Sequence, residues 1–312
     1  MLAILVLQAV LLAAPLVWLA LQRAPKSVGA VGAITAVGLV LLGVVLVGVW
    51  IYPPRWALVL VGLLYAVLGY RAWRRRNDGL ASGALRRATL LGGVLVWTVI
   101  GGALSWHGLS GRIKPHGDTL DLAAPLVGQG HCVISGGASS LLNFHLETLA
   151  AGKEAHRGQS YGVDFIARSS LGFRTIDAGW WRPAPKDPRS YLIFGAPIVA
   201  PCAGEVATAR DGMPDQPAGV SDLSVMAGNH VILQCEGYEV LLAHLRESSV
   251  SVVPGQHVQV GDHLGEVGNT GATDEPHLHV SVQRAIGSMQ PFGGRPVHLT
   301  FNGRYVARGD CL

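Results

Sequence analysis

Residues 276–283 read Pro-His-Leu-His-Val-Ser-Val-Gln, a stretch in which apolar side chains alternate with others. A period of two is typical of a β-strand, whose successive side chains point to opposite faces. His277 and His279 then share one face, while Leu278 and Val280 point into a core. Because neutral imidazole is the commonest protein ligand of zinc, two imidazoles on one face of a rigid strand suit a metal site. A His-x-His pair alone is a weak signal, so the surrounding segments are needed to support it.

Short β-type runs, separated by turns rich in Gly, Pro, Asn and Asp, occupy the chain from about Pro125 onward. No convincing amphipathic helix lies between them, so the sequence predicts an antiparallel all-β domain over residues 125–312. The interval 168–196 is expected to be a long loop or insertion. The nine predicted strands are Cys132–Ser135, Tyr161–Ala167, Ile198–Pro201, Glu205–Ala209, His230–Gln234, Val240–Leu245, His257–Val260, Leu264–Val267 and His277–Gln283.

The first 106 residues have a different composition from the rest of the chain. Of the 312 residues, 50% are hydrophobic and only 14% are charged, and the apolar excess lies in this first part. It predicts a membrane region of four transmembrane helices over residues 1–106, because a bilayer core needs about 20 apolar residues per helix. Residues 107–124 are then expected to form a linker. The four predicted spans are Leu2–Leu21, Val28–Tyr52, Trp56–Tyr70 and Ala88–Trp106.

The basic residues indicate how the chain is oriented in the membrane. The formal net charge is +4, and six arginines lie in the short segment 71–87 between two apolar spans. Without a basic stripe interleaved with aromatics, nucleic acid is not an expected partner. The arginines predict a cytoplasmic loop, and Arg23 with Lys26 agrees, which places the β domain on the exocytoplasmic side of a multi-pass cell membrane protein. The lipid bilayer is therefore an expected partner.

The spans themselves read as an anchor, because no ionisable residue lies in the middle of any of them. Glycines recur through the second span. Such glycines suit close helix packing or self-association of the protein through its helices.

All four cysteines lie outside the predicted membrane region. An even number in an oxidising compartment favours disulfides. Cys202 and Cys235 adjoin neighbouring predicted strands and are candidates for one bridge; Cys132 with Cys311 would then join the two ends of the domain. A zinc-thiolate site is the alternative, although no Cys-x2-Cys spacing supports it.

Candidate partners for the histidine pair lie in three other segments. His244 ends an apolar strand, and Asp164 is the one carboxylate in another. His145 follows Asn143 and Phe144, and His156 lies between His145 and Asp164. Three N or O ligands would leave a fourth tetrahedral position for water, which is the mark of a catalytic zinc site. Four further histidines are expected at the surface or in turns, namely His230, His257, His263 and His298.

The order of these motifs resembles that of the lysostaphin/LytM-type zinc metallopeptidases, a family of peptidoglycan endopeptidases. Ala-His-Leu at 243–245 is followed by V-x-x-G-x-x-V-x-x-G-x-x-L-G-x-V-G-N-T-G at 252–271 and by Glu-Pro-His-Leu-His at 275–279. Gly-Val-Asp-Phe-Ile at 162–166 and Ala-Pro-Cys-Ala-Gly-Glu-Val at 200–206 continue the likeness upstream. It covers most of residues 125–302 and implies a sheet of the lysostaphin/LytM peptidase type, while the membrane helices lie outside it.

The resemblance implies Asp164 and His279 as ligands of Zn2+, and His244 and His277 as catalytic histidines without a bond to the metal. The family commonly has its first ligand, a histidine, four residues before the aspartate, where this chain has Ser160. Some divergent members carry it further upstream in an Asn-x-His context, which His145 fits. His156, which lacks those flanks, is the alternative to His145.

The sequence thus predicts a membrane-anchored zinc endopeptidase, and the resemblance implies that its substrates are peptide bonds in peptidoglycan cross-bridges or stem peptides. His277 is the expected general base and His244 the expected donor to the developing oxyanion. A groove lined by Trp180, Trp181 and Tyr161 is the hypothetical place for an extended peptide. The alternatives are a catalytically inactive LytM-like module that binds and regulates cell-wall hydrolases, and a domain that acts on a non-wall ligand or protein.

Overall fold

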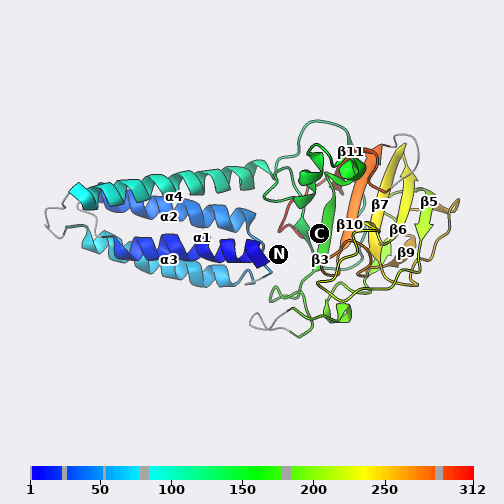
Figure 1. Ribbon diagram of the computed structural model, residues 1–312, viewed down its shortest axis with the longest axis horizontal. Helices are drawn as coiled ribbons and strands as arrows, with labels where there is room; N and C mark the ends of the chain where they lie inside the picture. Colours follow the sequence, from blue (N-terminus) through cyan, green and yellow to red (C-terminus); the bar gives the residue numbers. More distant parts are fainter. Residues whose placement is uncertain (1, 23–26, 52–53, 78–83, 178–183, 285–290) are drawn as a thin grey trace. The chain divides into compact units, whose positions relative to one another are not determined.

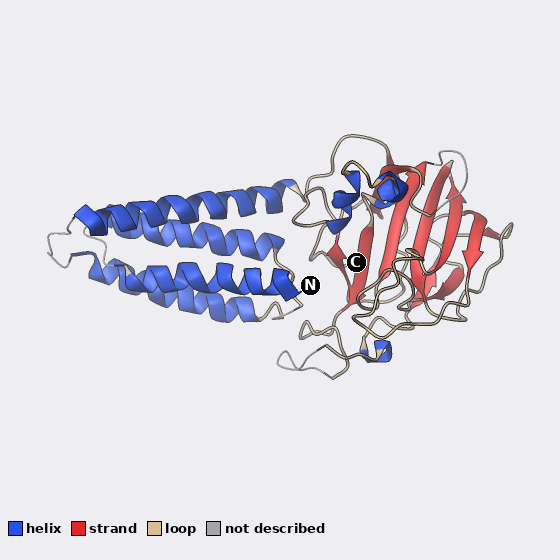
Figure 2. Cartoon of the chain, in the orientation of Figure 1, coloured by secondary structure: helices blue, strands red, loops and turns tan. Residues whose placement is uncertain are grey.

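The computed structural model describes residues 2–22, 27–51, 54–77, 84–177, 184–284 and 291–312 (Figure 1). The chain divides into two compact units, Met1–Ser110 and Gly111–Leu312. The first unit is helical and the second is rich in β-strands (Figure 2). The boundary lies four residues beyond the predicted end of the membrane region.

Four apolar helices make up the first unit, and each is long and apolar enough to cross a membrane. Their lengths of 18 to 27 residues agree with the four predicted spans. Differences are confined to the ends: α2 stops before the predicted Tyr52, while α3 and α4 both extend into or beyond the arginine-containing segment. The helices are α1 Leu2–Leu21, α2 Ser27–Val47, α3 Ala57–Arg74 and α4 Ala84–Ser110, with the 3-10 turn Arg75–Asn77 after α3.

Glycines allow α2 and α4 to approach each other closely. A Cβ added at Gly101 of α4 would lie 2.5 Å from the backbone nitrogen of Val40, and one at Gly43 of α2 would lie 2.5 Å from the Cβ of Leu104. Small residues at such contacts are the usual means by which helices pack in a membrane. The glycines of the second span were expected to serve close helix packing or self-association. Close packing of α2 with α4 is observed, whereas self-association stays a prediction.

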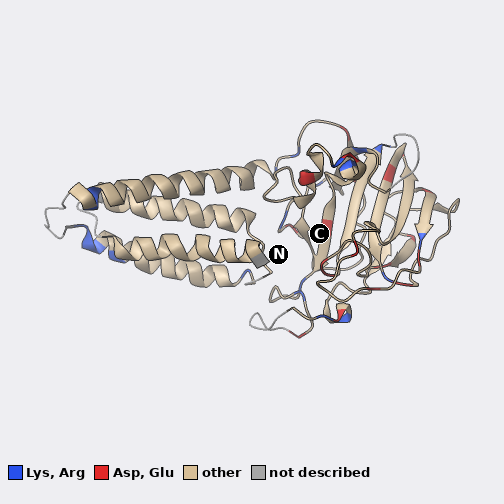
Figure 3. Cartoon of the chain, in the orientation of Figure 1, with Lys and Arg blue, Asp and Glu red and all other residues tan. Residues whose placement is uncertain are grey.

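Basic side chains of the helical unit gather where α3 ends and α4 begins (Figure 3). These are Arg71, Arg74, Arg75, Arg76, Arg86 and Arg87. Arg23 and Lys26, the other basic residues used to orient the chain, lie outside the described residues.

The second unit is built on a nine-stranded sheet in the order β1-β11-β10-β7-β6-β5-β8, with β3 against the remaining part of β10 and β2 against β3. Every pair is antiparallel except β1 with β11. β4 and β9 form a separate pair. The strands are β1 Thr119–Leu122, β2 His131–Ser135, β3 Val163–Ala167, β4 Pro197–Val199, β5 Gly204–Arg210, β6 Asn229–Cys235, β7 Tyr238–Leu245, β8 His257–Val258, β9 His263–Glu266, β10 Leu278–Arg284 and β11 Arg295–Phe301.

All nine predicted strands have a counterpart, and two strands were not predicted. β1 lies inside the predicted linker 107–124, whose first residues moreover continue α4 to Ser110. With four residues it is too short to show a period, and only pairing with β11 makes it a strand. β11 follows two glycines and has Pro296 at its second position, signals that otherwise favour a turn.

The sheet buries one face in the main core of the unit, to which Phe165, Leu242, Val280 and Phe301 belong. Two disulfides cross-link the unit. Cys202 is bonded to Cys235 at the end of β6, and Cys132 in β2 is bonded to Cys311. Both are the pairs expected from the sequence, so the zinc-thiolate alternative is excluded for these cysteines.

Candidate metal centre

Asp164 of β3 and His279 of β10 are direct partners across two antiparallel strands. Because paired residues share a face of the sheet, both side chains project on the face opposite to the main core. Oδ1 of Asp164 lies 2.9 Å from Nδ1 of His279. Both residues are buried, at 8% and 1% exposure, so a carboxylate and an imidazole meet away from bulk water.

His145 completes the cluster from a different part of the chain, the 3-10 helix Phe144–Leu149. Its Nε2 lies 3.0 Å from Oδ2 of Asp164, and its ring centroid lies 4.7 Å from that of His279. The candidate ligand atoms of His145, Asp164 and His279 all lie within 4.8 Å of one another. The structure therefore brings together the three residues expected to bind zinc.

Asn143 positions His145. Its buried side chain caps the 3-10 helix, with Oδ1 accepting a hydrogen bond from the backbone N–H of His145 at 3.0 Å. Its amide group donates to the carbonyls of Gly137 and Gly162, each at 3.2 Å. Gly162 lies two residues before Asp164, so Asn143 holds two ligand-bearing segments at a fixed separation.

Ser160, at the position where the resemblance implies a histidine, has a structural role here. It is fully buried, and its hydroxyl lies 2.7 Å from that of Thr148. Thr148 in turn is 2.7 Å from the carbonyl of His145. The two hydroxyls thus join the segment before Asp164 to the helix that carries His145.

His244 and His277 stand beside the cluster with their ring centroids 4.7 Å apart. Nδ1 of His244 lies 2.8 Å from the carbonyl of Thr270, and Nδ1 of His277 lies 2.8 Å from that of Glu275. A carbonyl only accepts, so each Nδ1 carries the proton and each ring presents Nε2 to the site. Nε2 of His277 is 3.8 Å from Oδ1 of Asp164.

The loop that holds His277 is itself anchored. The carboxylate of Glu275 accepts a hydrogen bond from the almost fully buried guanidinium of Arg174 at 2.9 Å. Arg174 belongs to the interval 168–196 that the sequence predicts as a long loop. The described part of this interval therefore braces the turn before His277.

The electrostatics of the site keep the carboxylate charged and most imidazoles neutral. Burial alone would raise the pKa of Asp164, but the positive character of His145 and His277 and hydrogen bonds from His145 and His279 hold it well below its ordinary value. Burial lowers the pKa of His279 to about 4, against the hydrogen bond that its Nδ1 donates to Asp164. Burial, reinforced by His277 and His279, lowers the pKa of His244 well below its usual range.

This donor set fits a divalent transition metal. Two imidazoles and one carboxylate are typical ligands of catalytic zinc, with bonds of about 2.0–2.1 Å that put tetrahedral donor atoms about 3.3 Å apart. The carboxylate oxygens of Asp164 already lie 3.0 Å and 2.9 Å from nitrogens of His145 and His279.

Other residues singled out in the sequence lie elsewhere. His156 is in the 3-10 helix Glu154–Gln159 and lines a neighbouring cavity, outside the cluster. Trp180 and Trp181 lie outside the described residues, so the predicted aromatic groove is not described; Tyr161 stacks on His298 with centroids 3.9 Å apart. Of the histidines expected at the surface, His257 and His263 are exposed, but His230 and His298 are buried at 3% and 7% exposure.

Sequence reasoning missed the residues that orient the histidines. Thr270 belongs to the Gly-Asn-Thr-Gly motif, and only the fold brings its carbonyl to His244. Phe292, whose ring centroid lies 5.5 Å from that of His279, carried no signal at all. Only the Asn-x-His spacing at 143–145 hinted at one of these supports.

Residues 192–298 match the sequence model of Peptidase family M23. The chain contains a peptidase M23 domain. The matched range includes His244, His277 and His279 and begins after His145 and Asp164. It covers only part of residues 125–302, over which the motifs resemble the family, and it lies wholly within the β-rich unit.

One curated relative is the cell division protein DipM of Caulobacter vibrioides, which is 34% identical over 92 residues. That alignment covers 29% of this chain and 13% of DipM, so the chain spans only a small part of its relative.

Two solved structures are similar to this chain. A zinc-containing peptidase from Vibrio cholerae is 21% identical, with a TM-score of 0.30, over 56% of this chain and 38% of that chain. The catalytic domain of the antimicrobial peptidase lysostaphin from Staphylococcus simulans is also 21% identical, with a TM-score of 0.27, over 44% of this chain and 74% of that chain. At these TM-scores the likeness carries no conclusion about activity.

Proposed function

We propose that the β-rich unit is a zinc metalloendopeptidase held at a membrane by the four helices of the first unit. The observation that carries the proposal is the convergence of His145, Asp164 and His279, with candidate ligand atoms within 4.8 Å, beside two further histidines. A structural zinc site is normally closed by four protein ligands, whereas three protein ligands leave a position open to substrate or water.

The protein's own groups divide the chemistry between them. Zinc, when bound by His145, Asp164 and His279, supplies Lewis acidity that polarises a carbonyl and acidifies water. His277 presents a free Nε2 to the site and accepts the proton that the attacking water releases. The carbonyls of Thr270 and Glu275 hold the two catalytic rings in one tautomer, so neither ring needs to reorient.

His244 is assigned to the developing oxyanion. In its neutral form, with the proton on Nδ1, its Nε2 is an acceptor. It therefore donates to an oxyanion only after taking up a proton itself. Its lowered pKa, caused first by burial, keeps it neutral before the reaction, and the negative charge that develops on the oxyanion then favours its protonated form. His244 and His277 accordingly act as a pair through which a proton enters and leaves the site.

The substrate class follows from the resemblance in the motifs, which implies peptide bonds of peptidoglycan cross-bridges or stem peptides. Two observations support an exocytoplasmic β-rich unit: its two disulfides, which persist in oxidising compartments, and the arginines at one end of the helical unit. Protease added to the outside of intact spheroplasts should then cleave the β-rich unit, and full protection would contradict this sidedness.

The test uses the full-length protein in detergent. We expect stoichiometric zinc by elemental analysis and new products from purified muropeptides. Asp164→Asn should lose both zinc and hydrolysis, whereas His277→Gln should keep zinc and lose at least about a hundredfold in kcat, the usual contribution of a general base. His257→Gln, a change at an exposed histidine of β8, is the control and should keep both.

The outcomes separate the competing functions. Zinc binding without hydrolysis of any muropeptide would favour the inactive regulatory module. Hydrolysis of proteins but not of muropeptides would favour a protein substrate. A wild-type protein without stoichiometric metal, or His277→Gln with unchanged kcat, would overturn the proposed mechanism.

A further inference from the structure

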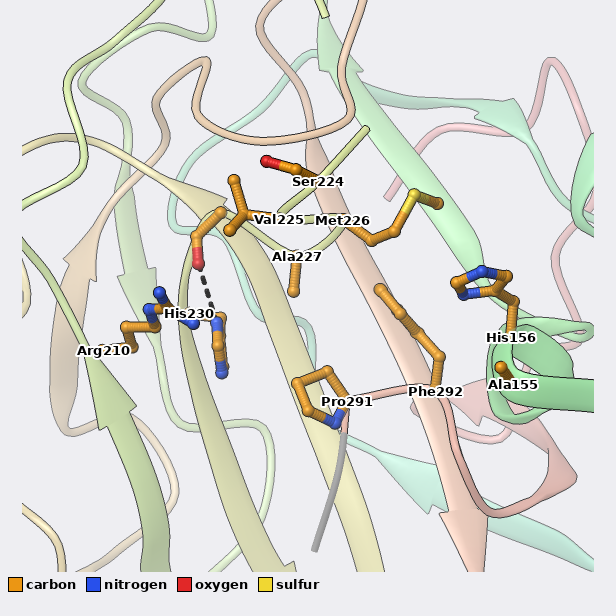
Figure 4. Close-up of a pocket in the computed structure, with 11 residues that line it drawn as sticks. Ala155, His156, Arg210, Ser224, Val225, Met226, Ala227, His230, Pro291 and Phe292 are labelled. Atoms are coloured by element: carbon orange, nitrogen blue, oxygen red, sulfur yellow. Dashed lines mark hydrogen bonds between the residues drawn. The ribbon is translucent and has the colours of Figure 1, made fainter. Parts of the chain in front are cut away.

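A cavity of about 290 Å3 lies beside the candidate metal centre (Figure 4). Segments from four places in the chain line it: the 3-10 helix that carries His156, the loop 224–228, the paired ends of β5 and β6, and the residues Pro291 and Phe292. Phe292 belongs to the lining and also contacts His279, with ring centroids 5.5 Å apart. Phe292 therefore separates the cavity from the candidate metal centre and contacts both.

A single row of paired residues runs across the sheet from the metal centre to the far end of the cavity. His279 of β10 pairs with Ala243 of β7, Ala243 pairs with His230 of β6, and His230 pairs with Arg210 of β5. Directly paired residues share a face of the sheet. Arg210 and His230 thus lie on the same face as His279, and Figure 4 shows their side chains next to each other in the cavity lining.

Arg210 supplies a positive charge that nothing described in the structure neutralises. Its side chain is exposed and makes no ion pair or hydrogen bond with the described residues. The adjacent carboxylate of Asp211 is turned away and accepts hydrogen bonds from the backbone N–H groups of Gly212, Ser248 and Val250. A guanidinium presented in this way, at the end of a cavity, is suited to bind a carboxylate.

His230 supplies a neutral hydrogen-bond acceptor next to that charge. Nδ1 of His230 donates to the carbonyl of Gly228 at 2.8 Å, which leaves Nε2 without a proton in the neutral ring. Burial lowers the pKa of His230, and the charge of Arg210 lowers it further against the Gly228 carbonyl, so the ring is neutral at pH 7. An acceptor beside a cation matches an N–H group next to a carboxylate, as found in a peptide.

The dimensions of the row fit an extended peptide. Three strand spacings of about 4.8 Å separate the positions of His279 and Arg210, which gives about 14 Å. An extended peptide rises about 3.3 Å per residue, so about four residues span this distance. Ala243, in the middle of the row, is fully buried in one cluster with Ala227 and Phe292, so a peptide that follows the row lies over Ala227 and Phe292, both of which line the cavity.

We propose that this cavity is a subsite that recognises a free carboxylate on the peptide substrate, about four residues from the bond held at the metal centre, with Arg210 as the residue that determines this specificity. The inference rests on the proposed peptidase function and adds to it the charge and the position of a substrate group. It implies that peptides with a carboxamide in place of that carboxylate are poorer substrates.

The experiment compares two probes on the full-length protein: a cross-linked muropeptide dimer with free carboxylates, and the same dimer after its carboxylates are converted to carboxamides. KM and kcat are measured for the wild type, for Arg210→Gln, and for Arg295→Gln as a matched control at an exposed arginine of β11. The wild type and the control should prefer the carboxylate dimer by about fivefold in KM, the effect expected for an exposed ion pair. Arg210→Gln should lose that preference with kcat unchanged.

The possible results distinguish a failure of the proposed subsite from a failure of the proposed function. A wild type that cleaves both dimers equally well, or Arg210→Gln with the preference intact, overturns the subsite and leaves the peptidase function standing. A wild type that cleaves neither dimer overturns muropeptides as the substrate of the proposed peptidase. Calorimetric titration of the two dimers in the presence of a chelator then tests the subsite alone: a carboxylate preference in Kd that Arg210→Gln removes supports it, and equal or absent binding rejects it.

Discussion

Asn143 shows how much of the candidate metal centre depends on residues that touch neither metal nor substrate. It accepts hydrogen bonds from the hydroxyl of Ser135 and the backbone N–H of His145, and it donates to two glycine carbonyls. Asn143 is only 1% exposed, so bulk water cannot replace these hydrogen bonds. The Asn143 amide therefore fixes the orientation of His145 relative to Asp164 together with the hydroxyls of Thr148 and Ser160.

Replacing Asn143 with alanine should weaken zinc binding with little change in the fold of the sheet. The change removes the cap of the helix that carries His145 and leaves two buried carbonyls unpaired. Loss of such a supporting group typically lowers metal affinity by about 10- to 100-fold. Competition with a chromophoric chelator measures the affinity, and far-UV circular dichroism reports the fold.

Gln234→Ala is the control for this prediction, because Gln234 is exposed on β6. It should bind zinc as tightly as the wild type. Wild-type zinc affinity in Asn143→Ala would show that His145 is held by other contacts.

The resemblance in motif order implies the five residues that the structure places together in the candidate site, with His156 as the alternative to His145, and their roles stay predictions. Asp164, His244, His277 and His279 each lie in or next to a predicted strand, and a strand fixes which face a side chain uses. The pairing of Arg210 with His230 could not be predicted from the sequence. It depends on register shifts in β5 and β6, and an irregular register leaves no period in the sequence.

Among the elements, α2 and α4 make the most extensive contact of the helical unit. Gly101 of α4 faces the backbone of α2, whereas nothing lies within 4 Å of a Cβ added at the neighbouring Gly102. The two glycines are adjacent in sequence yet differ completely in surroundings. Hydropathy alone reveals the spans, but it does not tell which glycine of a span lies at a helix contact.

Gly101→Val should destabilise the helical unit, because its side chain would collide with the backbone of Val40 and Leu39. Overpacking of this kind typically costs about 1–3 kcal/mol. Thermal unfolding of the full-length protein in detergent, followed by size-exclusion chromatography of heated samples, measures the effect. Gly102→Val adds the same side chain to open space and should unfold like the wild type; equal behaviour of the two variants would contradict the packing of α4 on α2.

At the scale of the molecule, the β-rich unit collects several imidazoles whose pKa values are lowered first of all by burial. Their folded forms stay neutral at a pH where the unfolded chain takes up protons. The lowered pKa of Asp164 also makes the folded state less stable as the pH falls, but at lower pH. The pKa of His145, which Asp164 raises against burial, has the opposite effect on stability. The histidines with lowered pKa are His131, His230, His244, His279 and His298.

The metal-free β-rich unit should therefore lose stability as the pH falls from 7.5 to 5.5. A folded-state pKa below the ordinary value of about 6.5 gives stability that is present above that value and is lost as the pH falls. Each histidine that stays neutral in the fold contributes up to about 1.4 kcal/mol over this range, and a combined fall in Tm of roughly 5 °C is expected. Calorimetry of the full-length protein with a chelator present checks this; a Tm that rises on acidification would contradict it.

The bond between Cys132 and Cys311 also constrains the route by which the protein matures. It links β2 to a residue that follows β11, and it encloses 179 residues of sequence. In the chain-entropy account, closing a loop of that size lowers the conformational entropy of the unfolded chain and so stabilises the folded state by about 5 kcal/mol. A nascent chain emerging from its N-terminus cannot form this bond until every strand has been synthesised. The bond between Cys132 and Cys311 therefore forms only after β11 has been synthesised and where an oxidant is present, whereas the bond between Cys202 and Cys235 can form earlier.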